Sequence, residues 1–111
     1  MKLTITFRNM DHSDLLHDYA LNKFAKVRDF LEGTIAQEPT NVHIILTAGR
    51  THHHHEVELH IQAPHYSTVI KRENPDMNLA IDQVMDIAVR ELTQHKERLL
   101  DKRDKSNNRP G

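Results

Sequence analysis

Two kinds of hydrophobic periodicity alternate along this chain. Near the N-terminus Leu3, Ile5 and Phe7 alternate with polar residues, which is the period of two typical of a strand with one buried face. The same alternation returns over residues 42–47 and 56–62, and a shorter apolar segment over residues 67–72 suggests an edge strand. The pattern therefore predicts four strands.

Two longer segments repeat apolar residues every three or four positions, which is the period of an α-helix. The first begins after Ser13, which suits an N-cap, and ends near Gly33, which we expect in the left-handed conformation that closes a helix. The second runs from Asn74, its expected N-cap, to about Lys105, with Pro75 in the first turn. The predicted order of elements is β-α-β-β-β-α.

The middle strands can be paired from their apolar positions. An antiparallel register places six apolar side chains on one face if it pairs Val42 with Ile61, Ile44 with Leu59 and Leu46 with Val57, and registers shifted by two do the same. The predicted fold is an α+β sandwich of two layers, like a double-stranded-RNA-binding domain, with two helices on one face of a four-stranded sheet. We expect one domain over residues 1–105 and a disordered tail over residues 106–111.

Composition narrows the class of protein. The chain of 111 residues has no cysteine, which excludes disulfides and thiolate metal sites, and its net charge of −1 does not by itself indicate nucleic-acid binding. No apolar segment approaches the roughly 20 residues of a membrane span, and the N-terminus lacks the apolar core of an export signal. These features favour a cytoplasmic protein with no membrane partner.

Charges are distributed unevenly around the predicted helices. Projection at the helical period places most acidic residues, Asp82 among them, on the outward back, and basic residues on the flanks of the apolar stripes. Lys23 and Lys26 share one flank of the first helix and Arg28 lies on the other. These basic flanks would concentrate positive potential beside the groove between the helices. Ordinary solvated helix flanks, supported by i,i+4 ion pairs, produce the same pattern of charges.

Four segments resemble the ribosome hibernation-promoting factors, the ribosome-associated inhibitor or S30EA-like family. They are LTIT, LHDYALNKFAKVRDFLE, EVELHI and PDMNLAIDQVMDIAVRELTQHKERL, and the resemblance spans about residues 1–103. The ordered pattern DM-xx-AID followed by R-x-L-x-x-HK-x-x-L is its most specific part. The length is similar to that of the short hibernation-promoting type. Asn78, where many members have an aromatic residue, and Phe7, Arg8 and Asn9, where many have glycine, are departures.

The resemblance implies a protein that is not an enzyme and needs no cofactor. Members bind the small ribosomal subunit in the decoding channel and block messenger RNA and transfer RNA sterically, which silences translation in stationary phase or stress. Short members act beside a separate ribosome modulation factor that favours inactive ribosome dimers, and we expect a monomer off the ribosome. Binding of ribosomal RNA would depend on phosphate neutralisation and shape.

The candidate RNA-binding residues come from two sources. Lys23, Lys26, Arg90, His95 and Lys96 stand at matching family positions. By helical projection the same basic edges continue through Arg28, Arg98, Lys102 and Arg103. His95 lies on the apolar stripe and fits a buried, hydrogen-bonded histidine equally well, and we expect Tyr19 and Phe24 to belong to the core.

Ten histidines, four of them consecutive at residues 52–55, suggest an alternative. In an extended strand His53 and His55 share one face, and the proposed register puts His43 opposite His60, so a surface site for zinc, nickel or copper is geometrically possible. The alternative function is thus a small metal-binding module, but we favour a polar hairpin tip.

Paired carboxylates also occur on one strand. Glu56 and Glu58 share a strand face, but no pocket-forming glycine-rich loop or nucleophile elbow accompanies them. We therefore predict that this strand face is solvated and not catalytic.

Overall fold

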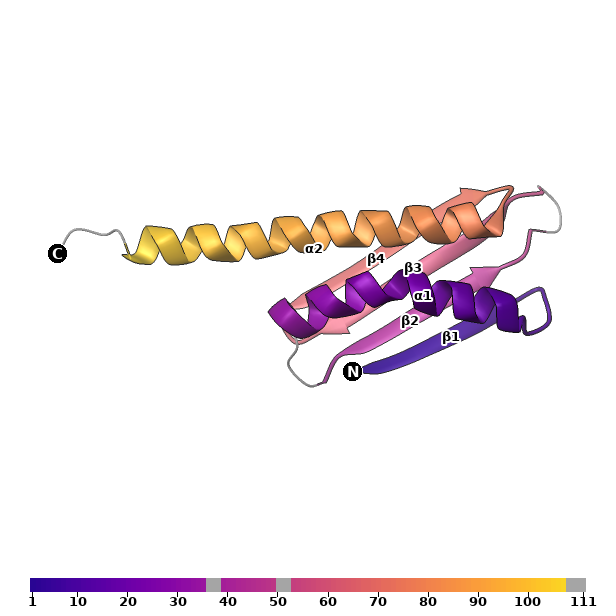
Figure 1. Cartoon of the computed structure of the whole chain (residues 1–111), viewed down its shortest axis with the longest axis horizontal. Helices are drawn as coiled ribbons and strands as arrows, with labels where there is room; N and C mark the ends of the chain where they lie inside the picture. The colour runs from indigo at the N-terminus through magenta and orange to yellow at the C-terminus, as the bar shows by residue number, and fades with distance from the viewer. Residues whose placement is uncertain (36–38, 50–52, 108–111) are drawn as a thin grey trace.

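The computed structural model describes residues 1–35, 39–49 and 53–107 and has the predicted order of elements. Its elements are β1 (Lys2–Arg8), α1 (Asp14–Phe30), η1 (Leu31–Ile35), β2 (Asn41–Thr47), β3 (His55–Ala63), β4 (Tyr66–Asn74) and α2 (Met77–Asn107). Both helices cover the same face of the sheet and point in the same direction (Figure 1). The predicted α+β sandwich of two layers is therefore confirmed.

The sheet has the strand order β1-β2-β3-β4. β1 and β2 are parallel and are joined through α1, as parallel neighbours need a crossover, whereas the other two pairs are antiparallel. β4 is an edge strand, as predicted. The predicted register is also confirmed, with Val42 opposite Ile61, Ile44 opposite Leu59 and Leu46 opposite Val57.

The core lies between the sheet and the two helices. The six paired side chains of β2 and β3 are buried, and α1 contributes Phe24 and Val27, both at 0% exposure. α2 adds Ile81 and Val84, which are also at 0% exposure. Burial of apolar side chains from both layers contributes about 1.5 to 3 kcal/mol for each large residue. Phe24 is a core residue, as expected.

The two ends of α1 differ from one another in how well they were predicted. Ser13 caps the N-terminus, because its Oγ accepts a hydrogen bond from the Leu16 amide at 3.2 Å. The prediction for Gly33 is wrong: this residue lies inside the π-helical turn η1 and its φ is not in the left-handed region. Leu31 is fully buried in η1, so the chain continues to turn against the core beyond the expected end of the helix.

The start of α2 is displaced from the predicted position. Asn74 is not the N-cap, because the pairing of β4 with β3 extends to Asn74 opposite His55. Asp76 caps the helix instead, since its Oδ1 accepts hydrogen bonds from the amides of Asn78 at 2.9 Å and Leu79 at 3.4 Å. Asn74 supports this turn through its own Oδ1, which accepts from the Asp76 amide at 2.9 Å. The chain thus passes from strand to helix within two residues.

α2 is longer than the sheet that it covers. Leu92 is 1% exposed, but residues 96–100 are all exposed, and the end of the helix projects past the sheet (Figure 1). The molecule is accordingly elongated, with extents of 63 × 25 × 19 Å. Residues 108–111 of the expected tail lie outside the described residues. None of the helices in the described ranges combines the length and the apolar character that a membrane crossing requires.

Candidate nucleic-acid interface

The flank between α1 and α2 is organised around Asp82. The Tyr19 hydroxyl donates a hydrogen bond to Asp82 Oδ1 at 2.7 Å, and Lys23 Nζ lies 3.5 Å from the same oxygen. The hydrogen bond to Asp82 raises the pKa of Tyr19 to about 12, helped by burial. The projection of Asp82 onto the outward back of α2 was therefore wrong, because the parallel packing of the helices turns this carboxylate toward α1.

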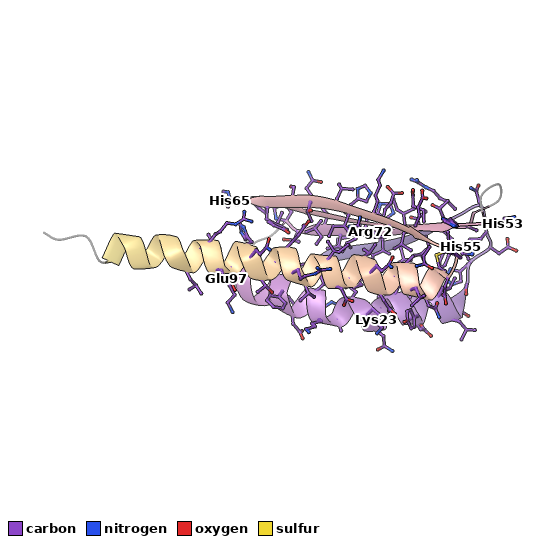
Figure 2. The ribbon with its side chains drawn as sticks, turned by 90° about the horizontal axis from the view of Figure 1, so that it is seen from above. Lys23, His53, His55, His65, Arg72 and Glu97 are labelled. Carbon is purple, nitrogen blue, oxygen red and sulfur yellow. The ribbon has the colours of Figure 1, made fainter. Side chains whose placement is uncertain are left out.

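Lys23 is a candidate cation whose position is restricted by two contacts, one with Asp82 and one with Tyr19. Its ammonium group lies 5.6 Å from the centroid of the Tyr19 ring, within the range of a cation–π contact. The side chain is nevertheless 46% exposed, and Figure 2 shows Lys23 on the side of the helices that is turned away from the sheet. Its charge is thus fixed in place and accessible.

Three other candidate cations, Lys26, Arg90 and Lys96, lie on the exposed surface of the helical layer. Helical geometry places Lys96 within about 40° of Asp82 on α2, and Arg90 about 160° away from buried Leu92, which is the outward side. None of the three forms an ion pair with a described residue. Their charges are therefore available to a ligand.

Arg28 lies apart from the lysines of α1. At about 100° per residue it is roughly 140° around the helix from Lys23. Its guanidinium carbon is 5.6 Å from the centroid of the Phe24 ring, so it covers one edge of the core. The structure does not bring Arg28 together with Lys23 and Lys26.

His95 and Arg98 lie on the opposite flank of α2, beside β4. The His95 ring is half-buried, with its centroid 4.9 Å from that of Tyr66. Together with Ser67, Thr68, Glu91 and Gln94 these residues line a hollow of about 270 Å³. His95 is thus partly buried, as expected for a packed histidine, and it also lines a surface hollow, as expected for a residue that contacts RNA.

Glu91 is a residue of this flank that sequence reasoning missed. It accepts a hydrogen bond from Thr68 Oγ1 at 2.8 Å and a longer one from the Tyr66 hydroxyl at 3.5 Å. Burial, followed by the charge of Glu91 and this hydrogen bond, raises the pKa of Tyr66 to about 12. No spacing in the sequence indicates these contacts, because they depend on β4 lying next to α2.

The predicted RNA-binding residues therefore do not form a single cluster. They spread over the outer surface of the helical layer, from Arg28 across Lys23 and Lys26 to Lys96 and Arg90, and then to Arg98 and His95. The side chains of Lys102 and Arg103 lie outside the described residues.

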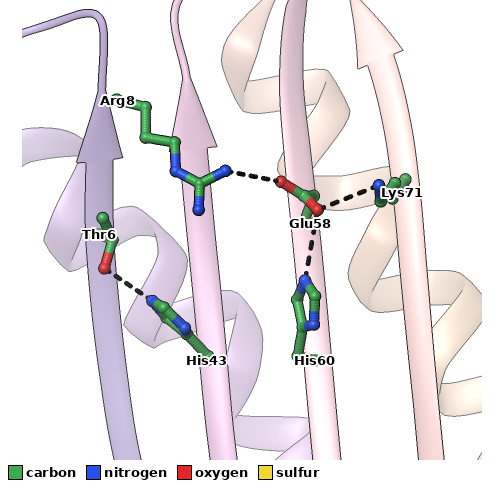
Figure 3. A network of polar contacts seen from close by, with 6 residues as sticks. All are labelled: Thr6, Arg8, His43, Glu58, His60 and Lys71. Carbon is green, nitrogen blue, oxygen red and sulfur yellow. Dashed lines mark hydrogen bonds and ion pairs between the residues drawn. The ribbon is translucent and has the colours of Figure 1, made fainter.

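The uncovered face of the sheet carries a different arrangement of charges. Glu58 is only 6% exposed and lies within reach of Arg8 at 3.6 Å, His60 at 3.3 Å and Lys71 at 3.3 Å (Figure 3). Burial alone would raise the pKa of Glu58, but hydrogen bonds from His60 and Lys71 outweigh it and hold the pKa below its ordinary value. The prediction of a solvated Glu58 is wrong, because β3 is central and cations from β1 and β4 close over it.

The two histidines on the uncovered face of the sheet are engaged in local contacts. His43 and His60 are cross-strand partners, as predicted, with ring centroids 6.3 Å apart. However, His43 Nε2 lies 2.7 Å from Thr6 Oγ1 and His60 contacts Glu58 (Figure 3). Among the described residues no three histidine, aspartate or glutamate side chains converge as metal ligands would.

The histidine run is not an extended strand. His55 begins β3 and its Nδ1 accepts a hydrogen bond from the Gly49 amide at 3.1 Å, whereas His53 precedes the strand with a left-handed φ of 55°. The alternation of faces assumed for these residues is therefore wrong, because the hairpin turn includes His53. His52 lies outside the described residues.

Proteins named ribosome hibernation promoting factor match this chain in sequence. The ribosome hibernation promoting factor of Salmonella typhimurium is 29% identical over 99 residues, which cover 89% of this chain and 97% of the relative. The protein of the same name from Pseudomonas putida is 31% identical over 98 residues, covering 88% and 89% of the two chains. The present chain thus matches relatives over nearly their whole length.

Solved structures match the fold. The N-terminal domain of Thermus thermophilus Protein Y superposes with a TM-score of 0.69 at 18% identity, covering 86% of this chain and 99% of that domain. A ribosomal subunit interface protein from Coxiella burnetii gives a TM-score of 0.66 at 20% identity, covering 87% and 99%. The sequence profile described as sigma 54 modulation protein / S30EA ribosomal protein matches residues 3–100. The chain therefore belongs to the sigma 54 modulation protein / S30EA ribosomal protein family.

Proposed function

We propose that this protein is a ribosome hibernation factor that binds the small ribosomal subunit in the decoding channel. There it excludes messenger RNA and transfer RNA sterically and silences translation in the cytoplasm. The match of the family profile over residues 3–100, with similarly sized relatives named ribosome hibernation promoting factors, is the observation that carries the proposal. A ribosome modulation factor acting alongside it would favour inactive ribosome dimers.

The charges of the helical layer support an RNA partner. Although the net charge is −1, Lys26, Arg90 and Lys96 are exposed on the helices and form no ion pair with a described residue. A cation that neutralises a phosphate releases a bound counterion, and this release favours association with RNA at low salt. Lys23, restrained by Asp82 and Tyr19, adds a cation whose position is set before binding.

The shape of the molecule supports steric occupancy. Its cross-section of 25 × 19 Å is small compared with its length of 63 Å, and the two helices lie side by side over one face of the sheet (Figure 1). Recognition of structured RNA depends mainly on backbone contacts and shape, which such a face can supply. Inhibition by occupancy requires no chemical step, so the protein's residues need only bind and fill space.

Sedimentation with purified small ribosomal subunits tests the proposal. We expect the protein to co-sediment with these subunits at low and moderate salt, and to prevent a labelled messenger RNA from binding them. Replacement of Lys23, Lys26, Arg90 and Lys96 by Glu should weaken binding by at least about 100-fold, because four attractive contacts become repulsive. The thermal unfolding midpoint should fall only slightly, since all four side chains are exposed and only Lys23 loses an ion pair, its contact with Asp82.

Two results would count against the proposal. Absence of co-sedimentation under both salt conditions would refute ribosome binding, and unaltered binding of the fourfold variant would refute the placement of the interface. A variant with Ser at residues 52–55 serves as a control and should bind normally. Loss of binding in that control would restore the histidine hairpin as a functional element.

A further inference from the structure

The hollow between β4 and α2 is separate from the flank that carries Lys23 and Lys26. It lies at the end of the sheet where Figure 2 labels His65 and Glu97, the chain neighbours of Tyr66 and Arg98. Its volume of about 270 Å³ is slightly below the range of about 300 to 1,000 Å³ that is typical of pockets for drug-sized ligands. The hollow therefore suits a single small group.

One wall of the hollow is aromatic. The rings of Tyr66 and His95 have centroids 4.9 Å apart and an interplanar angle of 50°, and both residues are half-buried. Each ring therefore keeps an accessible part that a planar ligand can contact. Stacking of an RNA base on an aromatic side chain contributes about 1 to 3 kcal/mol and is available to every base.

A fixed hydrogen-bond acceptor lies beside this wall. Glu91 receives its hydrogen bonds from Thr68 and Tyr66 on the same oxygen, Oε2. Among the described residues no donor reaches Oε1, so this oxygen can accept a hydrogen bond from a ligand. The Tyr66 hydroxyl is protonated at physiological pH and donates to Glu91, and this contact contributes to raising its pKa to about 12.

A cation completes the hollow. Arg98 lines it, is exposed, and forms no ion pair with a described residue. A bare phosphate would be attracted by Arg98 but repelled by Glu91. A ligand with hydrogen-bond donors at one end and a negative charge at the other matches both side chains, and a nucleotide has this distribution.

Because the acceptor in the hollow is the carboxylate of Glu91, it restricts which RNA bases can bind there. Cytosine, adenine and guanine each carry an exocyclic amino group that donates to a carboxylate, whereas uracil presents carbonyl oxygens at the corresponding positions. The one ring N–H of uracil lies between two carbonyl oxygens, which a carboxylate repels, so uracil should bind more weakly. Gln94 adds an amide that both donates and accepts at the same hollow. Unpaired bases that leave the stack are the usual targets of sequence-specific RNA recognition.

We propose that this hollow binds one unpaired RNA nucleobase that carries an exocyclic amino group. The base stacks on one of the two tilted rings, Tyr66 or His95, and contacts the edge of the other. Its amino group donates to Glu91, and its phosphate is neutralised by Arg98. This inference rests on the proposed function, since it assigns to the ribosome-binding surface a site that selects among nucleotides.

NMR titration of the full chain with tetranucleotides of cytidine and of uridine tests the pocket. We expect the amides of Ser67, Thr68, Glu91 and Gln94 to shift with the cytidine oligomer, and affinity for the uridine oligomer to be about 10-fold lower, within the range of one good base contact. Glu91→Gln retains an acceptor for Thr68 and Tyr66 but loses the charge, so the preference should fall to about 2-fold or less. The same resonances confirm that the variant is folded.

Glu97→Gln is the matched control, because Glu97 is an exposed carboxylate on α2 that does not line the hollow. It should keep the wild-type preference for cytidine. Equal affinity for the two oligomers, shifts confined to the Lys23 and Lys26 flank, or an equal loss of preference in Glu97→Gln would overturn the proposal. Binding of cytidine monophosphate as tight as that of the tetranucleotide would assign the site to free nucleotides instead of RNA.

The two proposals fail in distinguishable ways. If wild-type protein co-sediments with small subunits but shows no preference among oligomers, ribosome binding stands and the base pocket is lost. If the preference is present without co-sedimentation, the hollow is a nucleotide site and the proposed ribosomal function is lost.

Discussion

The helical layer and the uncovered face of the sheet both carry basic residues, but they use them differently. On the sheet, Arg8, His60 and Lys71 converge on Glu58 from three strands. On the helices, Lys26, Arg90 and Lys96 have no acidic partner among the described residues. The distribution of unpaired charge, and not the net charge of −1, therefore distinguishes the proposed RNA-binding surface from the face of the sheet, whose charges pair with one another.

The geometry of the two layers explains this difference. Neighbouring strands lie about 4.8 Å apart, so side chains on one face of a sheet come within reach of partners two strands away. Cations at different angles around a helix instead diverge from its axis. A carboxylate in the middle of a sheet can hold several cations, whereas the cations on the helices remain separate.

The largest expected effect is a difference in ribosome binding between two variants. Each variant loses three positive charges, one from the helical layer and the other from the uncovered face of the sheet. A helical variant with Lys26→Ala, Arg90→Ala and Lys96→Ala should bind small subunits about 100-fold more weakly, and the slope of log affinity against log salt should fall in magnitude by about 2 to 3. A sheet variant with Lys2→Ala, Arg8→Ala and Lys71→Ala has the same net charge and should bind within about 3-fold of wild type. Sedimentation at several salt concentrations measures both.

Equal weakening by the two triple variants would contradict the comparison. It would mean that net charge, and not the arrangement of charges on the helical layer, controls association.

A smaller effect is expected for the carboxylate that joins the strands. Glu58→Ala leaves three basic groups without their shared partner and should lower the free energy of unfolding by about 1 to 3 kcal/mol. Glu56→Ala, on the same face of β3, should change it by less than about 0.5 kcal/mol. Urea denaturation measures both variants, and ribosome binding should be unaffected in each. Similar stability losses in the two variants would show that the contacts of Glu58 contribute nothing specific.

The contribution of Glu58 should also depend on pH. Because its pKa is lower in the folded protein than its ordinary value of 4.5, the folded state binds fewer protons at this group than the unfolded state. Its stabilising effect is therefore present above pH 4.5 and is lost as the pH falls through the folded value. The stability difference between wild type and Glu58→Gln should shrink over that range, and a difference independent of pH would contradict the assignment.

The smallest effect concerns the two tyrosines, which touch carboxylates on opposite flanks of α2. The chain has two tyrosines and no tryptophan, so the ultraviolet absorbance of tyrosinate reports Tyr19 and Tyr66 alone. Both should ionise near pH 12 in the folded protein and near 10.0 in urea, and the stabilisation that they provide is lost as the pH rises through 12. Asp82→Asn should lower the pKa of one tyrosine and leave that of the other near 12. Two unchanged titrations would contradict the contact with Tyr19.

Most of the fold was predictable because it depends on local alternation. Apolar side chains at every second position of β2 and β3 allow few registers, and the one proposed, with Ile44 opposite Leu59, is present. Ser13 could also be predicted as a cap, because its hydrogen bond spans only three residues and depends on local sequence. Asn74 and Asp76 both suit a cap, and the choice between them depended on how far β4 pairs with β3.

The environment of the acidic residues was not predictable from one sequence. Asp82, Glu58 and Glu91 all occur where a polar pattern favours solvent, yet each contacts groups from another element. These contacts depend on which strands and helices are neighbours, and an alternation of apolar and polar residues carries no information on strand order. The exposure of Lys26, Arg90 and Lys96 was easier to predict, because the helical period alone places these side chains on the outward side.

Because α2 projects beyond the sheet, its two halves should differ in local stability. Up to Leu92 one face of the helix is packed on the core through buried side chains such as Ile81 and Val84, so we expect exchange with solvent hydrogen there to require cooperative opening of the domain. From residue 96 onward the backbone is protected only by its own turns, which isolated helices of this length maintain marginally in water. In a single uninterrupted helix we therefore expect slowly exchanging amides to be followed by rapidly exchanging ones, and a ligand that binds the projecting end would have to order it at a cost in free energy.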